Sequence, residues 1–236
     1  MKRQFIAAAM LCLPLVGQGA EKGDSPWSGE FDLGVSAKTG NTESTNIQGK
    51  LDLHYDKALW RHRFRLGALR ETESGEKTAQ RVTGQFQSNY QLGERSYLFG
   101  VARAERDEFS GYDYQASLVA GFGYRLWMSE QGHLDLEAGP GFRRAKQDDL
   151  KAENEAVGRL RGDFKYKLGE RSDFSQELTV IAGQENTETE SITALTAGIN
   201  DALALRLSLT VSHNTEVPQG TKKTDTFTTA SVVYKF

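Results

Sequence analysis

The chain ends in Thr226-Phe227-Thr228-Thr229-Ala230-Ser231-Val232-Val233-Tyr234-Lys235-Phe236, where apolar and polar residues alternate up to the last position. Successive side chains of a strand point to opposite sides, so counting back in twos places Phe236, Tyr234 and Val232 on one face. Lys235 and the hydroxyl residues before it share the other face with Val233. The stretch therefore predicts a terminal β-strand with one apolar face. An ordinary closing strand of a soluble β-domain would alternate in the same way.

The two aromatic residues at the end favour a more specific interpretation. A terminal Phe with a second aromatic residue two positions earlier resembles the recognition signal of bacterial outer-membrane β-barrels. We therefore expect Phe236, Tyr234 and Val232 to form an assembly signal that the barrel-assembly machinery binds during biogenesis. The expected location is the bacterial outer membrane, with its lipid as the second partner.

An export signal is predicted at the amino terminus. Lys2 and Arg3 precede an apolar run over residues 5–16, and a stretch rich in small residues follows at 17–20. This order is that of a cleavable secretory signal peptide. We therefore divide the chain into a signal peptide, residues 1–20, and one barrel domain, residues 21–236, and leave the cleaved bond open. Cys12 lies within the signal peptide, so the mature chain has no disulfide or thiolate metal site.

Composition excludes some functions but does not choose the fold. The full chain carries 29 Lys and Arg against 32 Asp and Glu, and loss of Lys2 and Arg3 leaves a net charge of −5. We therefore predict no nucleic-acid partner, which would need a basic stripe. No other segment approaches the roughly 18 to 20 apolar residues of a membrane helix. The 24 glycines and 26% charged residues fit a soluble domain and a barrel with a wet interior equally well.

Alternation of apolar and polar residues recurs along the whole chain. Trp27, Gly29, Phe31, Leu33 and Val35 form the first series, with polar or glycine partners between them. The apolar face is less clear in the segment 97–105, and the facing of 192–199 is ambiguous. An even number of strands of about ten residues is typical of a membrane barrel. The fold class is therefore all-β, a 12-stranded antiparallel up-and-down transmembrane β-barrel. The predicted strands cover residues 27–38, 47–55, 60–68, 82–90, 97–105, 114–124, 134–142, 156–166, 174–180, 192–199, 203–211 and 226–236.

The connections and the aromatic residues support the same fold. Barrels of the outer membrane have short periplasmic turns, longer outer loops and aromatic rings at the membrane boundaries. We predict outer loops over residues 39–46, 71–79, 106–113, 144–155, 183–191 and 214–225, and turns over 56–59, 91–95, 127–132, 167–172 and 200–202. The aromatic residues expected at the periplasmic end are Trp27, Tyr55, Trp60, Tyr90, Tyr97, Tyr124, Trp127, Tyr166, Phe174, Tyr234 and Phe236. A repeated sequence in two turns, 90–96 and 166–172, indicates that one turn conformation is used twice.

Several segments resemble the YdiY-like family of salt-induced outer-membrane proteins. They are Trp27-Ser28-Gly29, Thr39-Gly40-Asn41-Thr42-Glu43-Ser44, Asp107-Glu108-Phe109-Ser110-Gly111-Tyr112-Asp113 and the end from Thr228 to Phe236. The resemblance spans nearly the whole mature chain and implies a barrel in the outer membrane. Because the family is classed as a domain of unknown function, the resemblance assigns no catalytic or binding residue.

The predicted register places many charges of both signs in the lumen. They are Arg61, Arg63, Arg65, Arg81, Arg125, Arg143, Arg159, Arg161 and Arg206, with Glu30, Asp32, Asp52, Asp135, Glu137, Asp163 and Glu177. One hypothesis is a basic track that attracts small anions, formed by Arg61, Arg63, Arg65, Arg159 and Arg161. The alternative, which we favour, is a solvated interior in which the charges pair with one another. A 12-stranded barrel is wide enough for either.

Enzyme chemistry is weakly indicated. His54, His62, His133 and His213 are isolated in the sequence, and Ser212 beside His213 is the one pair that resembles a nucleophile and its base. The acidic residues Asp148, Asp149, Glu153 and Glu155 would attract divalent cations, but such a run is usually a solvated loop. We therefore assign no catalytic residue, no metal ligand and no cofactor.

The expected function is a narrow passive channel for small ions or solutes. The link to envelope or ionic stress comes from the family resemblance alone. The alternative is a non-conducting structural or docking barrel, and a barrel hydrolase is a distant third. The oligomeric state is left open.

Overall fold

The computed structural model describes residues 25–39, 44–73, 76–107, 112–147, 152–217 and 222–236. The predicted signal peptide, residues 1–20, lies outside these ranges. Residues 40–43 and 108–111, which carry part of the family resemblance, also lie outside them, as do Asp148 and Asp149.

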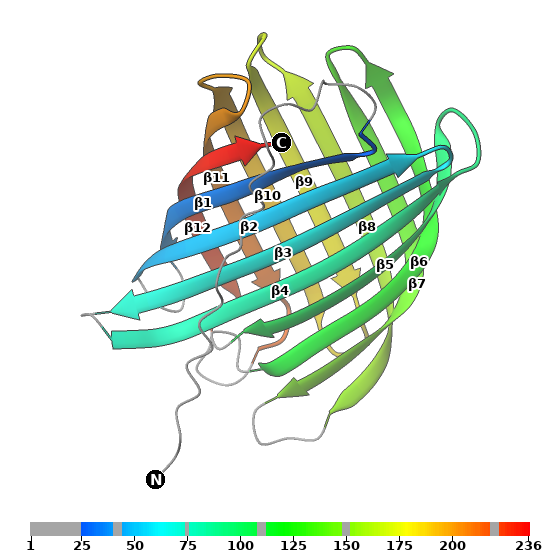
Figure 1. The fold of residues 1–236 in the computed structure, drawn as a ribbon. Helices are drawn as coiled ribbons and strands as arrows, with labels where there is room; N and C mark the ends of the chain where they lie inside the picture. Colours follow the sequence, from blue (N-terminus) through cyan, green and yellow to red (C-terminus); the bar gives the residue numbers. More distant parts are fainter. Residues whose placement is uncertain (1–24, 40–43, 74–75, 108–111, 148–151, 218–221) are drawn as a thin grey trace.

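All regular secondary structure in the described ranges is β-strand, and the strands close into one barrel (Figure 1). Each strand is antiparallel to the next one in sequence, and β12 pairs back onto β1. This confirms the predicted 12-stranded up-and-down barrel. The strands are β1 (Trp27–Thr39), β2 (Ser44–Lys57), β3 (Trp60–Glu73), β4 (Glu76–Gln91), β5 (Ser96–Asp107), β6 (Tyr112–Ser129), β7 (Gly132–Gln147), β8 (Glu153–Lys167), β9 (Ser172–Ala182), β10 (Thr187–Gly198), β11 (Leu203–Asn214) and β12 (Thr224–Lys235).

The described ranges contain no helix of the length and apolar character that a membrane crossing requires.

The seam between β1 and β12 is closed by the last residue of the chain. Leu33 lies opposite Val232 and Phe31 opposite Tyr234. Beyond β12, the Gly29 N–H donates to the Phe236 carbonyl at 2.8 Å, and the Phe236 N–H donates to the Gly29 carbonyl at 3.0 Å. A Cβ at Gly29 would lie 2.9 Å from the Phe236 ring, so glycine leaves room for that ring. We call this end of the barrel the terminal end and the opposite end the far end.

The outer surface of the wall is apolar. Outward side chains such as Phe142 (71% exposed), Leu118 (62%) and Leu160 (60%) face away from the barrel, while their neighbours along each strand face the lumen. An apolar exterior around a polar interior is the reverse of a water-soluble protein, and it matches a hydrocarbon environment.

Aromatic rings gather on the outer surface near the terminal end. Trp27 packs on Tyr55, Trp60 on Tyr90 and Trp127 near Tyr166, with centroid distances of 4.8, 4.9 and 6.2 Å. Tyr97 does not belong to this belt. The prediction for Tyr97 is wrong because its ring points inward and is only 2% exposed.

The strands are longer than the hydrophobic pattern indicates. β3 ends at Glu73 and β4 begins at Glu76, within the loop predicted over 71–79. β10 begins at Thr187, five residues before the predicted start, because its first residues are Thr, Glu and Ser and give no apolar period. The far-end connections are therefore shorter than predicted, and the longest lies between β11 and β12.

The repeated turn is confirmed. In one copy the Leu92 N–H donates to the Ser96 carbonyl at 2.9 Å, and in the other the Leu168 N–H donates to the Ser172 carbonyl at 2.8 Å. The same local sequence thus closes β4 to β5 and β8 to β9 with the same hydrogen bond.

Candidate functional site

The lumen holds the candidate site. It contains a cavity of ≈ 620 Å³ lined by residues from all twelve strands. Ten Lys and Arg side chains and eleven Asp and Glu side chains line it, so the formal charges nearly cancel. The volume falls within the range of small-molecule sites. The residues that line the lumen differ from one side of the barrel to the other. The ion pairs described next lie where these two sides meet.

Asp52 on β2 organises the charges next to it on β3. Arg63 donates from Nε to Asp52 Oδ1 at 2.8 Å and from Nη2 to Oδ2. His54 Nε2 lies 3.1 Å from Asp52 Oδ1, and Arg65 Nε lies 3.5 Å from Oδ2. A carboxylate that accepts a bidentate Arg contact holds that guanidinium in a fixed orientation. Asp52 therefore holds the Arg63 guanidinium along the wall. It contacts only Nε of Arg65, so the two terminal nitrogens of that guanidinium can bind elsewhere.

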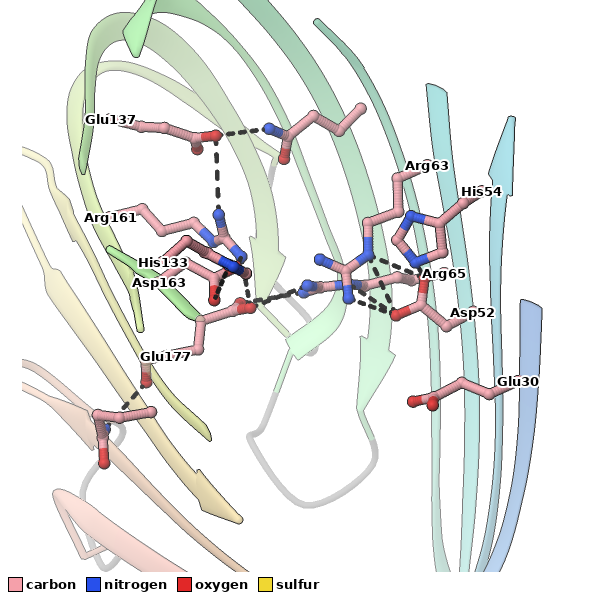
Figure 2. Close-up of polar contacts among 12 residues, drawn as sticks. Glu30, Asp52, His54, Arg63, Arg65, His133, Glu137, Arg161, Asp163 and Glu177 are labelled. Carbon is pink, nitrogen blue, oxygen red and sulfur yellow. Dashed lines mark hydrogen bonds and ion pairs between the residues drawn. The ribbon is translucent and has the colours of Figure 1, made fainter. Parts of the chain in front are cut away.

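Arg65 reaches across the barrel to Glu177. Its Nη1 donates to Glu177 Oε1 at 3.0 Å and its Nη2 to Oε2 at 2.8 Å. Arg161 on β8 donates to the same Oε2 at 2.6 Å. Figure 2 shows both guanidinium groups converging on this carboxylate. Because β3 and β9 are six strands apart in either direction around the barrel, the Arg65–Glu177 pair spans the lumen.

Glu137 on β7 forms a second buried centre. It accepts hydrogen bonds from Gln87 Nε2 at 2.7 Å, from Tyr97 OH at 3.1 Å and from Arg159 Nη1 at 2.8 Å. Arg161 lies 3.7 Å away, which connects this centre to Glu177. The Glu137 side chain is 1% exposed. Buried charges persist only when they are paired and hydrogen-bonded, and Glu137 meets this condition.

One side of the lumen is filled by apolar side chains, which we call the lumenal apolar cluster. The ring of Tyr97 sits over Gly123, where a Cβ would lie 2.3 Å from the ring. The Arg159 guanidinium lies 5.5 Å from the Phe99 ring centroid and covers one edge of the cluster. All members are 5% exposed or less. The lumenal apolar cluster consists of Tyr97, Phe99 and Val101 on β5, Val119 on β6, Val157 on β8 and Ile181 on β9.

The opposite wall, formed by β1, β2, β10, β11 and β12, lines the cavity, and we call it the wet side. Arg206 is its main ion-pairing residue. Its Nη1 donates to Glu30 Oε1 at 2.8 Å and to Asp32 Oδ2 at 3.0 Å, and its Nε donates to Thr196 Oγ1 at 3.2 Å. These contacts run along the wall and not across the lumen. Water-sized space therefore remains in front of them.

Charges nearer the far end form another layer. Arg103 donates to Glu105 at 2.5 Å and lies 3.9 Å from Glu188 on β10. Arg81 lies 3.7 Å from Glu105 and 5.3 Å from the Phe227 ring centroid on β12. This layer again links opposite sides of the barrel through side chains of both signs.

The residues of the predicted basic track all lie close to carboxylates. Arg61 lies at the terminal end, 55% exposed and 3.8 Å from Asp56. Arg63 and Arg65 contact Asp52, while Arg159 and Arg161 contact Glu137. This arrangement favours the alternative of a mutually paired interior, and the track remains a prediction. The residues of the predicted assembly signal, Phe236, Tyr234 and Val232, lie on the outer surface at the seam, about half exposed.

The acidic residues that the structure describes at the far end do not form a metal site. Glu155 binds Arg143 at 2.6 Å, and the hydrogen bond between Glu153 and Glu185 raises the pKa of the exposed Glu185. Among the described residues, no group of three His, Cys, Asp or Glu side chains is arranged to hold a metal ion.

Ser212 and His213 do not form a catalytic pair. As neighbours on β11 they point to opposite faces of the wall. His213 Nδ1 instead lies 2.8 Å from Thr224 Oγ1. The structure therefore contradicts the one nucleophile and base pair that the sequence suggests.

Sequence reasoning missed the lumenal apolar cluster. Its signal was present in the segment 97–102, where apolar residues or glycine occupy both faces of the strand. The other members are single apolar residues on inward faces that are otherwise polar or glycine, and the alternation alone does not bring them together.

Solved structures and a curated relative resemble this chain. The NanC porin is 12% identical with a TM-score of 0.61, covering 87% of this chain and 100% of that chain. The translocator domain of the autotransporter NalP from Neisseria meningitidis (12%, TM-score 0.53) covers 92% and 90%. The KdgM porin in complex with disordered oligogalacturonate (12%, TM-score 0.52) covers 88% and 99%. These likenesses concern the fold alone.

Two sequence comparisons identify the family. The uncharacterized protein YdiY of Escherichia coli strain K12 is 27% identical over 215 residues, which cover 89% of this chain and 83% of that protein. Residues 31–236 match the family described as "Protein of unknown function, DUF481". The matched range begins within β1 and continues to the last residue of the chain. The chain belongs to the DUF481 family, whose function is unknown.

Proposed function

We propose that this protein is a narrow passive channel of the bacterial outer membrane for small ions and solutes. The observation that carries the proposal is the cavity of ≈ 620 Å³, which is lined by charged and polar side chains from every strand. Two of the proteins with a similar fold are described as porins, which supports the same conclusion. The link to ionic stress rests on the family resemblance and adds no residue to the argument.

The proposed path follows the wet side. The lumenal apolar cluster occupies the side formed by β5, β6, β8 and β9, where its members are 5% exposed or less. The Arg65–Glu177 pair spans the lumen and borders the cavity. Because this pair crosses the lumen, it narrows the path, and we expect only small solutes to pass. The near balance of lining charge predicts weak selectivity between anions and cations.

Planar-bilayer conductance of the refolded protein tests the proposal. We expect a small, reproducible open level in KCl, and a higher level for Arg65→Ala, which removes the side chain that crosses the lumen. Arg171→Ala is the matched control, since Arg171 is 58% exposed in a terminal-end turn and lies outside the cavity lining. A protein that folds but never gives an open level would overturn the channel.

The same recordings test the basic track. Replacing Arg61, Arg63 and Arg65 by Gln should move the reversal potential towards cation preference if these residues attract anions. An unchanged reversal potential would remove the track from the proposal and leave the channel in place.

A non-conducting structural barrel is the second candidate. The observation that favours it is the chain of contacts from Arg65 through Glu177 and Arg161 to Glu137, which links β3, β9, β8 and β7. If these contacts seal the lumen together with the rest of the packed interior, neither the wild-type protein nor Arg65→Gln should give an open level. A seal made by this chain alone would instead be opened by the substitution.

A further inference from the structure

Two charged side chains of the cavity stand apart from the ion-pair network. Every other Lys, Arg, Asp or Glu that lines the cavity has an opposite charge within 4.0 Å. Within the described part of the chain, Lys50 on β2 and Glu190 on β10 have no such partner and no hydrogen bond to the side chain. Charges without partners inside a protein require water or a ligand.

Lys50 and Glu190 both belong to the wet side. The strands β2 and β10 are four strands apart, separated by β1, β12 and β11. Lys50 is exposed to the cavity although the barrel wall surrounds it, and its neighbour across the β2–β3 pair is Gly67, which has no side chain to cover it. Asp32 lies opposite Lys50 across the β1–β2 pair, and Glu190 lines the same cavity.

The two charges line the same cavity without contacting each other. They lie more than 4.0 Å apart, since they form no ion pair with each other. Leu69, Ile192 and Phe227 line the same cavity and supply apolar surface. Leu69 is two residues from Gly67 on one face of β3, and Ile192 is two residues from Glu190 on one face of β10. The cavity thus offers an ammonium, an apolar surface and a carboxylate.

We infer that Lys50 and Glu190 form a binding subsite for small zwitterions, molecules with a carboxylate and an ammonium group joined by a short hydrocarbon chain. The ligand carboxylate pairs with Lys50 Nζ, its ammonium pairs with the Glu190 carboxylate, and its chain lies on the apolar surface. A zwitterion satisfies both groups without adding net charge to a lumen that is already nearly balanced. A simple anion at Lys50 would leave the Glu190 carboxylate without a partner.

This inference adds a ligand class to the proposed channel. It rests on the proposed function only in one respect, that the bound ligand is also the transported solute. Binding is a property of the folded barrel itself. It is therefore measured on the detergent-solubilised full barrel, without any membrane or current.

The test is calorimetric titration with glycine, β-alanine, 4-aminobutanoate and 6-aminohexanoate, which differ in charge separation. Butanoate, butylammonium and glycerol are the single-charge and neutral comparisons. We expect one zwitterion length to bind at least fivefold more tightly than butanoate or butylammonium. Lys50→Gln and Glu190→Gln should each weaken that binding about tenfold, because each removes one charge-assisted hydrogen bond.

A charge exchange keeps the test decisive if single variants fold poorly. The double variant Lys50→Glu with Glu190→Lys keeps both charges in the cavity and should bind the same zwitterion, in the opposite orientation, more tightly than either single Gln variant does. Lys167→Gln and Glu170→Gln, at exposed positions of the terminal end, are matched controls and should leave binding unchanged. Equal binding of butanoate or butylammonium, no binding of any zwitterion, or unchanged binding by both Gln variants would overturn the subsite.

The two proposals fail separately. Zwitterion binding in detergent without any open level in bilayers would overturn the channel and leave the subsite. An open level in KCl without zwitterion binding would overturn the subsite and leave the channel.

Discussion

The two sides of the lumen are built by the same strand alternation and yet have opposite interiors. On the side of the lumenal apolar cluster, inward residues such as Phe99 and Val119 are 3% and 1% exposed, and the polar group beside them, Glu137, is fully paired. On the wet side, Lys50 and Glu190 face the cavity with no ion-pair partner among the residues that the structure describes. We therefore expect the loss of a buried, paired group on the first side to cost more stability than the loss of an unpaired charge on the second.

The largest difference between the two sides is expected for loss of a carboxylate. Glu137→Ala leaves Arg159 buried without its carboxylate partner, so the free energy of unfolding should fall by about 3 to 5 kcal/mol. Glu190→Ala should change it by less than about 0.5 kcal/mol, since that carboxylate pairs with no side chain. Urea unfolding of the barrel in vesicles measures both values. Similar losses at the two positions would remove the distinction.

Arginine substitution on both faces of the wall gives the next largest effect. On the wet side, Leu209→Arg faces lipid and should cost about 2 to 4 kcal/mol, while Thr210→Arg enters the cavity and should cost less than about 1 kcal/mol. On the other side, Leu118→Arg and Val119→Arg should both be costly, because both faces of β6 are apolar there.

The same unfolding measurement reads all four arginine variants. On the wet side, we expect arginine to be destabilising only on the lipid-facing side of the strand. On the other side of the barrel, we expect it to be destabilising on both faces of the strand. If Val119→Arg is tolerated as well as Thr210→Arg, the lumenal apolar cluster is not a packed interior.

The smallest expected effect comes from removing one methylene group on each side of the lumen. It distinguishes a packed side chain from one that borders the cavity. Ile181→Val removes a methylene from the lumenal apolar cluster and should cost about 0.5 to 1.5 kcal/mol. Ile192→Val makes the same change on the wet side, where the side chain borders the open cavity, so the cost should be below about 0.5 kcal/mol. Equal costs would mean that Ile192 is packed as tightly as Ile181.

Local patterns were sufficient where one face of a strand is apolar and the other polar. The inward arginines and carboxylates of β3, β7 and β8 follow directly from a period of two. Tyr97 was misplaced because residues 97–102 are apolar or glycine on both faces, so the period does not distinguish lipid from lumen. The start of β10 was missed because Thr187 to Ser191 contains no apolar residue.

The sequence predicted many of the charged residues that face the lumen, but not which of them contact one another. Lys50 and Glu190 drew no attention in the sequence because neither belongs to a motif, and their importance comes from the lack of a partner. That property depends on all other charges of the cavity and has no local sequence signal.

The sequence by itself determined the class of fold and the number of strands. It also determined which face of the wall most side chains occupy and that the last strand closes the barrel. These follow from a two-residue period, which is a property of neighbours along the chain. Only the tertiary structure decided which charges meet. Arg65 and Glu177 are 112 residues apart, and they pair because barrel closure and register bring β3 and β9 to opposite walls of one narrow lumen. The division into a dry and a wet side arises in the same way, from contacts across the barrel that no single strand encodes.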